Sequence, residues 1–359
     1  SRRLGLQVSL KREDMQSVYS FKLRGAYNKM AQLSVDQKST GVITASAGNH
    51  AQGVAISAQK LGIRATIVMG LNTPSIKVNA VRDRGAKVVL HGDNYNEAAL
   101  HAKHLCESEG LIYIPPYDDV DVIAGQGTIG MEIVNQHSRP LDAIFIPVGG
   151  GGLIAGVAAY VKYLHPKTKI IGVEAEGSNC LDAAMKAGRR VSLPIEKLDL
   201  FADGVSVAQI GKETFKIAKR YVDDVVVVSV DEICAAIKDV FEDTRCVAEP
   251  AGALAIAGMK RYAVANPGMS HVVSIVSGAN VNFDRLRHIS ERAEVGESRE
   301  AILAVTIDEA KGSFLKFCRA LGKRAITEFN YRCADADQAH IYVGIGVKSK
   351  EDRLDLVVQ

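Results

Sequence analysis

The sequence predicts an α/β fold, and three observations support this class. Short β-branched runs alternate with helical patterns from residue 41 to about residue 176. These runs are almost entirely apolar, which is typical of parallel strands that helices cover on both faces. Several of the runs end in glycine-rich turns, at the edge where open α/β sheets bind their ligands. The length of 359 residues favours two or three domains.

The elements follow one another in a regular order. A helical pattern opens near Lys22, and later ones begin near residues 49, 75, 96, 123 and 152. After Gly177 the alternation loosens, with helices predicted over 179–187, 210–220, 231–242 and 250–265. The predicted strands are GVITA (41–45), RATIVM (64–69), AKVVLH (86–91), LIYIP (111–115), DAIFIPV (142–148), KIIGVEA (169–175), DDVVVVSV (223–230) and HVVSIVSG (271–278).

A boundary is predicted where the chain becomes highly charged, from about residue 285 to residue 300. This stretch has few apolar residues and is typical of a linker or an exposed connecting helix. Beyond it, AILAVTI, KGSFLKFCRALG, ITEFNYR and AHIYVGIGV predict strand, helix, strand, strand. That order begins a ferredoxin-like βαββαβ unit whose last helix and strand are missing or just starting. We therefore expect the sequence, which begins at Ser1 rather than Met, to be a fragment.

Composition excludes several classes of function. Apolar residues make up 47% and charged residues 24%, and the formal net charge is only +3 with both signs interleaved. We therefore expect no nucleic-acid partner. No apolar run reaches the length of a membrane span, so no membrane partner is expected. The six cysteines show no metal-type spacing, which favours reduced thiols in a cytosol-like compartment and no metal site.

Three glycine-rich turns carry the strongest chemical signal: SAGNHAQG (46–53), GGGGL (149–153) and SGAN (277–280). Each follows a predicted buried strand, so all three can converge on one pocket. Consecutive glycines at a helix start leave backbone N–H groups open to an anion, which predicts a phosphate site at residues 149–152. The plainer alternative is a tight strand-to-helix turn.

Two cofactors compete for this phosphate site. Gly150, Gly152 and Ala155 match a dinucleotide fingerprint, and Glu174 stands about twenty residues further on. That interpretation leaves SAGNHAQG and Lys22 without a role. Pyridoxal phosphate needs a phosphate cradle, a lysine, a partner for its ring nitrogen and a site for the substrate carboxylate. The chain has a residue or turn for each of these four needs, in that order the glycine loop, Lys22, Ser277 and the turn at 46–49. The plainer interpretation of Lys22 is a solvated surface residue, which a lone lysine at a helix start usually is.

The motifs that carry a family resemblance are SVYSFKLRGAYNKM, ITASAGNHAQGVA, PVGGGGLIAGVA, EPAGALA and SIVSGANVNF. In this order they resemble the biosynthetic threonine ammonia-lyases, also called threonine deaminases or dehydratases. The resemblance implies the two-lobed fold type II of pyridoxal 5'-phosphate enzymes and covers essentially the whole chain. It implies a catalytic domain at 1–285 with a smaller lobe at roughly 38–126, a linker at 286–298, and the start of an ACT-like regulatory domain at 299–359.

Carried over residue by residue, the resemblance implies a set of site residues. Lys22 would form the Schiff base, Phe21 would pack near the cofactor ring, and Ser277 would face the pyridine nitrogen. Asn49 would hydrogen-bond the 3-hydroxyl of the ring. The expected phosphate loop is Gly149, Gly150, Gly151, Gly152 and Leu153, and the expected substrate-carboxylate site is Ser46, Gly48, Asn49 and His50.

Three further groups leave two interpretations open. Glu249 lies in the family motif EPAG, where direct contact with the site and a structural turn are equally expected. His50 can be a general base because histidine titrates near neutrality, but a packing or hydrogen-bonding role is favoured. Glu13 and Asp14 could be paired carboxylates, but the cations beside them favour a local ion network.

The implied reaction is β-elimination of L-threonine to 2-oxobutanoate and ammonia, the first committed step of isoleucine biosynthesis, with L-serine giving pyruvate. Lys22 would remove the Cα proton, and a hydroxyl at Ser277 would favour elimination over transamination. Other enzymes of the fold, such as serine racemase or serine dehydratase, are the alternatives. The resemblance also implies a cytoplasmic or organellar homotetramer that isoleucine inhibits, with valine opposing this inhibition, and a weak response if the regulatory domain is incomplete.

Overall fold

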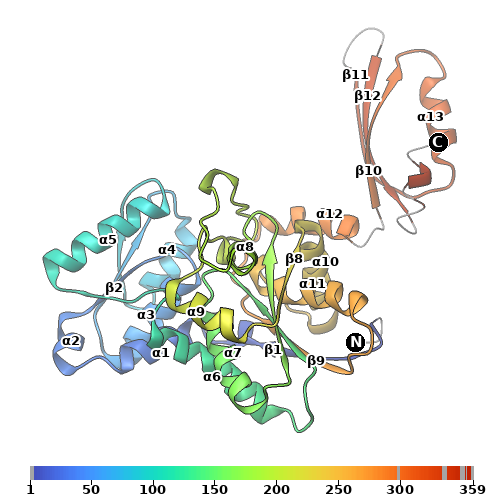
Figure 1. The fold of residues 1–359 in the computed structure, drawn as a ribbon. Coiled ribbons are helices and arrows are strands. Elements are labelled where there is room, and N and C mark those ends of the chain that lie inside the picture. Colours follow the sequence, from blue (N-terminus) through green and yellow to red (C-terminus); the bar gives the residue numbers. More distant parts are fainter. Residues whose placement is uncertain (1–3, 297–299, 334–337, 348–351, 353, 357–359) are drawn as a thin grey trace. The chain divides into compact units, whose positions relative to one another are not determined.

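The computed structural model describes residues 4–296, 300–333, 338–347, 352 and 354–356. They form two compact units, which Figure 1 shows as ribbons. Unit 1 comprises 1–229 and 240–281, and unit 2 comprises 230–239 and 282–359.

Unit 1 contains a small parallel sheet in the strand order β4-β3-β2-β5. Its strands are β2 (Val42–Ala45), β3 (Ala65–Met69), β4 (Lys87–Leu90) and β5 (Ile112–Tyr113). One face packs against α1 (Lys22–Ala31), α3 (Asn49–Leu61) and α4 (Ser75–Arg82), and the other packs against α5 (Tyr95–Glu109). The apolar strands are therefore covered on both faces, as predicted.

The larger sheet of unit 1 is also parallel, in the order β1-β9-β6-β7-β8. Along β6, Ile144 and Ile146 join a core with helices on one face, while Phe145 meets Tyr262 of α11 on the other. The strands are β1 (Gln7–Arg12), β6 (Ala143–Pro147), β7 (Lys169–Ala175), β8 (Asp224–Val228) and β9 (His271–Val276).

The other helices of unit 1 are α2 (Val35–Thr40), α6 (Val120–Gln136), α7 (Gly152–Leu164), α8 (Cys180–Ala187), α9 (Lys212–Tyr221) and α11 (Pro250–Ala265), with short 3-10 turns at Glu13–Met15, Ile195–Lys197 and Asp203–Val205.

The sequence did not predict strand β1 or helix α2. Strand β1 has the sequence QVSLKR and lies at the edge of the large sheet, paired with β9 alone. Edge strands tolerate polar side chains, so the apolar signal that marked the other strands is absent here. Helix α2 has only six residues and buries none of them.

Unit 2 contains β10 (Glu300–Asp308), α13 (Ser313–Leu321), β11 (Ile326–Cys333) and β12 (Gln338–Gly346). This is the predicted order of strand, helix, strand, strand. The antiparallel sheet has the order β10-β12-β11, and Ile341 and Val343 of β12 turn into its core. The charged stretch that precedes it forms α12 (Arg285–Gly296), which agrees with the expected connecting helix. Helix α10 (Val230–Thr244) has residues in both units.

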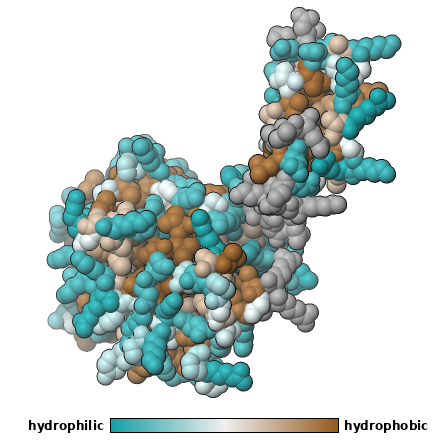
Figure 2. All heavy atoms as spheres, turned by 45° about the vertical axis from the view of Figure 1, so that its right-hand side comes forward, coloured by the Kyte–Doolittle hydropathy of each residue, from teal (hydrophilic) through white to brown (hydrophobic). Residues whose placement is uncertain are grey.

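The surface drawn in Figure 2 is mostly hydrophilic, with a hydrophobic area exposed on unit 1. Isolated exposed apolar side chains are normal on folded proteins. Within the described part of the chain, no helix is both long enough and apolar enough to cross a membrane.

Candidate functional site

Lys22 is the first residue of α1 and is half-buried in unit 1. Lys22 Nζ donates a hydrogen bond to the carbonyl oxygen of Pro116 at 3.0 Å, and it lies 5.4 Å from the ring centre of Phe21. Burial lowers the pKa of the Lys22 amine to about 8, and the charge of Glu249 partly offsets this. The positive end of the helix dipole also disfavours an ammonium here. Such an amine is a nucleophile near neutral pH.

The four glycines at 149–152 connect β6 to α7. Gly151 has a φ of +91°, which favours glycine, and a Cβ on Gly150 would lie 2.3 Å from the ring of Tyr117. Helix α7 begins at Gly152 with no side-chain cap, so the N–H groups of its first turn remain available to an anion. The side chain of Leu153 packs into the core, so only its backbone can contribute.

The turn at residues 46–49 connects β2 to α3. Gly48 N donates to Ser46 Oγ at 3.2 Å, and α3 begins at Asn49 without a side-chain cap. Its cap position is Gly48, and residues 46–49 are half-buried. It can bind a second anionic group, such as a carboxylate.

His50 is buried beside this turn and has a fixed tautomer. Its Nε2 lies 2.9 Å from the carbonyl oxygen of Ile114, so Nε2 carries the hydrogen and donates it. Burial, with the charge of Lys22, lowers the pKa of His50 to about 3. His50 is therefore neutral and a weak base near pH 7, in line with the packing or hydrogen-bonding interpretation.

Ser277 lies at the carboxyl end of β9, next to the lysine segment. The backbone oxygen of Ser277 accepts from Phe21 N at 3.2 Å, and Ser277 Oγ donates to the carbonyl oxygen of Ala251 at 3.1 Å. The hydroxyl oxygen can accept a further hydrogen bond in this arrangement. Because a hydroxyl has only one hydrogen, Ser277 Oγ can donate to a ring nitrogen only if its hydrogen bond to Ala251 breaks.

Glu249 lies at a helix start and also contacts Asn49, a residue predicted for the site. It is the cap residue of α11, which makes it part of a turn, and its carboxyl is also in direct contact with a predicted site residue. Asn49 Nδ2 donates to Glu249 Oε1 at 2.6 Å. Burial raises the pKa of Glu249 to about 7.

Several contributors to the site escaped sequence reasoning. Pro116 accepts from Lys22, Tyr117 covers the glycine loop, and Asn280 donates to Asn49 Oδ1 at 2.7 Å. The run IPPYDD lies between a predicted strand and a predicted helix, which marks a special turn. Asn280 lies in the quoted turn SGAN, but its spacing alone does not show its partner.

The acidic pair near the N-terminus is an ion network, as expected; Asp14 pairs with an adjacent cation as predicted, and Glu13 does not. Glu13 is 1% exposed and binds Arg24 of α1 at 2.7 and 2.8 Å rather than the cations beside it. Arg24 also binds Glu132 of α6, while Asp14 binds its neighbour Arg12. Chain folding brings these groups together, so the sequence could not show the pairing.

Glu174, which the dinucleotide alternative requires, is committed elsewhere. It is fully buried, and its carboxyl accepts hydrogen bonds from Leu181 N and Asp182 N, both at 2.8 Å. These N–H groups belong to the first turn of α8. Glu174 therefore caps a helix and is not available to a ribose.

The residues present fit pyridoxal phosphate. A half-buried amine of lowered pKa lies in the same unit as two uncapped helix starts, one of them in a glycine loop. Among the described residues, five buried side-chain atoms have no hydrogen-bond partner, and two of them, Ser20 Oγ and His50 Nδ1, belong to the segments of Lys22 and Asn49. Buried polar atoms are nearly always paired, so these two atoms are consistent with a ligand in this part of the fold.

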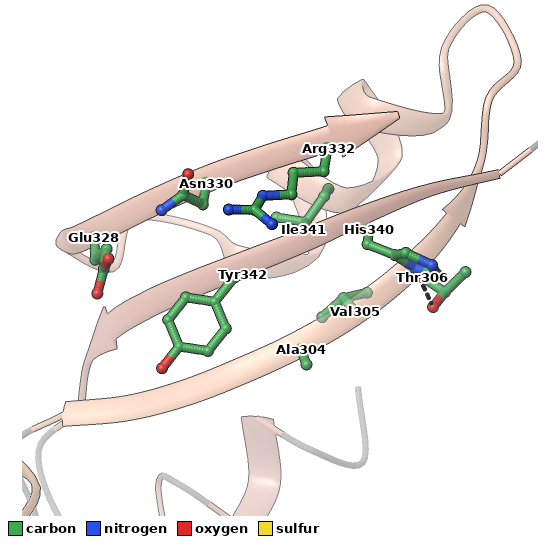
Figure 3. A pocket seen from close by; sticks show the side chains of 9 residues that line it. All are labelled: Ala304, Val305, Thr306, Glu328, Asn330, Arg332, His340, Ile341 and Tyr342. Carbon is green, nitrogen blue, oxygen red and sulfur yellow. Dashed lines mark hydrogen bonds between the residues drawn. The ribbon is translucent and has the colours of Figure 1, made fainter. Parts of the chain in front are cut away.

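Unit 2 has a separate hollow of about 410 Å³ on the open face of its sheet, and Figure 3 shows its lining. None of the residues predicted for the reaction lines it. Glu328 and Arg332, both on β11, place one charge of each sign among its lining residues.

Comparison with known protein families gives two matches along the chain. Residues 1–278 match the family described as pyridoxal-phosphate dependent enzyme. Residues 291–359 match the family described as the C-terminal regulatory domain of threonine dehydratase.

Individual relatives agree with these matches. The biosynthetic L-threonine dehydratase of Pasteurella multocida is 55% identical over 100% of this chain and 70% of its own length. That of Escherichia coli is 55% identical over 99% of this chain and 69% of its own length.

Solved structures confirm the predicted fold class. The processed threonine deaminase isoform 2 of Solanum lycopersicum superposes with a TM-score of 0.80 at 51% identity, covering 82% of this chain and 85% of its own. A serine racemase of Dictyostelium discoideum gives 0.73 at 32% identity, covering 79% and 90%. On this evidence the chain belongs to the pyridoxal-phosphate dependent enzymes, and within them to the biosynthetic threonine dehydratase family.

Proposed function

We propose that this chain is a threonine ammonia-lyase that converts L-threonine to 2-oxobutanoate and ammonia, with L-serine giving pyruvate as a secondary reaction. The observation that carries the proposal is the half-buried Lys22 amine, which donates to Pro116 and has a lowered pKa, in the same unit as the glycine starts of α3 and α7. One helix start suits a phosphate and the other suits a carboxylate. A pyridoxal phosphate enzyme acting on an amino acid needs both.

The phosphate of the cofactor would be held by Gly149, Gly150, Gly151, Gly152 and the backbone of Leu153. Lys22 would hold the cofactor through its amine, with Phe21 packed beside it. When bound, pyridoxal phosphate supplies a conjugated ring that stabilises negative charge at the Cα atom of an amino acid. Lys22 is the group that would accept the proton from Cα, since its pKa of about 8 suits a base near neutrality.

The substrate would bind through its carboxylate at the start of α3. Ser46, Gly48, Asn49 and His50 surround that helix start, and a neutral His50 can serve only as a hydrogen-bonding group there. Ser277 would face the ring nitrogen. A hydroxyl gives that nitrogen little reason to stay protonated, which favours elimination over transamination.

The remaining features of the proposal concern the whole protein. Residues 1–285 would form the catalytic domain, with its smaller lobe at roughly 38–126, residues 286–298 the linker, and residues 299–359 the ACT-like regulatory part. Isoleucine and valine would be the effectors and a homotetramer the assembly. The location would be the cytoplasm or an organelle, since relatives include a chloroplastic enzyme of Arabidopsis thaliana and a mitochondrial one of Schizosaccharomyces pombe.

The test is turnover of purified protein supplied with pyridoxal phosphate. We expect 2-oxobutanoate from L-threonine and slower formation of pyruvate from L-serine. Lys22→Ala should lose turnover, because the amine that binds the cofactor and moves the proton is gone. Lys60→Ala, a change in the last turn of α3, is the matched control and should retain it. D-serine as the main product from L-serine would favour a racemase instead.

A further inference from the structure

Three polar side chains from distant parts of the chain meet at the start of α3. Asn49 Nδ2 donates to Glu249 Oε1 at 2.6 Å, and Asn49 Oδ1 accepts from Asn280 Nδ2 at 2.7 Å. Asn280 Nδ2 also donates to the carbonyl oxygen of Val18 at 2.9 Å, and the backbone N–H of Asn280 bonds the Glu249 carboxyl. Both ends of the Asn49 amide are therefore engaged by the protein.

These contacts fix which way the Asn49 amide faces. A flipped amide would place its N–H₂ group against the N–H donors of Asn280 and its oxygen against the carboxyl oxygen of Glu249. Both contacts would be unfavourable, so only one orientation is compatible with the two neighbours. A primary amide has two N–H hydrogens, and Glu249 takes one of them. One N–H of Asn49 remains to bind something else.

The backbone around Glu249 is shaped to admit its carboxyl. A Cβ on Gly278 would lie 2.4 Å from Glu249 Oε1, and a Cβ on Gly252 would lie 2.0 Å from the carbonyl oxygen of Gly278. Neither position can carry a larger residue without displacing the carboxyl or the turn beside it. Two glycines thus create the space in which Glu249 reaches Asn49.

Burying the Glu249 carboxyl is energetically unfavourable if its only role is packing. It is 5% exposed, and burying a carboxyl costs free energy unless hydrogen bonds compensate for the lost water. Its raised pKa, caused mainly by burial, reflects that cost. A helix cap does not require such burial, because exposed polar residues cap helices elsewhere in unit 1. The arrangement is better explained by a need to orient Asn49.

We propose that Glu249 and Asn280 are positioning residues that hold the Asn49 amide in a single orientation, with its unused N–H presented to the ring oxygen of pyridoxal phosphate. This inference rests on the proposed function and assigns a role to two residues outside the predicted site. Neither residue needs to touch the reacting atoms. Their effect on the orientation of the cofactor passes through Asn49, whereas the charge of Glu249 also acts directly on the Lys22 amine.

The test is a double-mutant cycle on cofactor affinity, measured by titrating pyridoxal phosphate into the cofactor-free protein. Asn49→Ala and Glu249→Ala should each weaken binding about tenfold, which corresponds to ~1.4 kcal/mol. Because Glu249 acts through Asn49, the double variant should also be about tenfold weaker than the wild type rather than a hundredfold. Circular dichroism of the bound cofactor should change in both single variants, since the ring loses its fixed hydrogen bond.

Two further variants control for damage to the fold. Glu249→Gln keeps an acceptor for Asn49 and should retain more affinity than Glu249→Ala. Ser274→Ala removes a fully buried hydroxyl with no partner among the described residues, on the strand that leads to Ser277, and should leave affinity and the dichroism unchanged. If the double variant binds pyridoxal phosphate about a hundredfold more weakly than the wild type, the two residues act independently. This inference is then wrong, while the proposed function stands. A wild-type chain that binds no pyridoxal phosphate would contradict the proposed function as well.

Discussion

Helices α5 and α6 begin differently from α3 and α7. Asn94 caps α5 by accepting from Glu97 N, and Asp119 caps α6 by accepting from Asp121 N and Val122 N. Helices α3 and α7 begin after glycines and have no side-chain cap. Every helix start has N–H groups without intrahelical partners. The first pair of helices satisfies some of these groups with its own side chains, and the second pair has no such side-chain partner.

Caps from distant residues strengthen the contrast. Asp118 accepts from Lys212 N and Glu213 N at the start of α9, and Glu174 does the same for α8. The fold therefore supplies carboxylates to helix starts even where the local sequence has none. At α3 and α7 it supplies none. The starts of α1, α4 and α11 also lack a side-chain cap, so a missing cap marks the proposed site only together with a glycine turn.

The largest effect is expected from giving α3 the cap that it lacks. A Cβ on Gly48 meets nothing within 4 Å, so Gly48→Asp can be accommodated. Its carboxylate would bind the first-turn N–H groups and repel a substrate carboxylate, raising KM for threonine by roughly a thousandfold. The same cap should stabilise the protein by ~1 kcal/mol. Steady-state kinetics and urea unfolding measure the two effects.

The matched control is Asn94→Asp, which places a carboxylate at the start of the capped helix α5. It should leave KM unchanged, because that helix start has no ligand to lose. An unchanged KM in Gly48→Asp would show that α3 does not bind the substrate carboxylate.

A smaller effect, on stability, is expected from replacing Lys22. This cation stands at the start of α1, another helix without a side-chain cap. In the cofactor-free protein the Lys22 pKa is about 8, against 10.5 for an ordinary lysine. The unfolded chain therefore binds more protons between pH 8 and pH 10.5, and stability rises with pH across that window. Below pH 8 the amine is charged in the folded protein, and its partial burial lowers the free energy of unfolding by the full amount. Lys22→Met should be more stable by ~3 kcal/mol at pH 7, with the difference vanishing near pH 10.5.

Urea unfolding of both proteins at pH 7 and pH 10 measures this difference. Equal stabilities at both pH values would mean that the amine is solvated in the folded protein. The site would then lack its half-buried nucleophile.

The smallest effect is expected from removing a cap at a helix that binds nothing. Asn94→Ala should lower the free energy of unfolding by ~1 kcal/mol, the usual contribution of an N-cap side chain. Cofactor affinity and KM should stay at wild-type values. A loss of cofactor affinity would remove the distinction between capped and uncapped helices.

The sequence predicted the features that depend on local pattern. Apolar runs located the buried strands, and glycine turns located the starts of α3 and α7. It missed what depends on distant contacts, such as edge strand β1, whose side chains are largely polar. The partner of Glu13 is Arg24, and the partners of Asn49 are Glu249 and Asn280, all brought together only by folding.

The central claim is that Lys22 is the residue that binds pyridoxal phosphate. The most direct measurement is reduction of the cofactor-loaded protein with borohydride, followed by digestion and mass spectrometry of the peptides. The account predicts loss of the visible absorption and a reduced cofactor on the peptide that contains Lys22, with none in Lys22→Ala. A cofactor attached to another lysine, or equal labelling of Lys22→Ala, would contradict it.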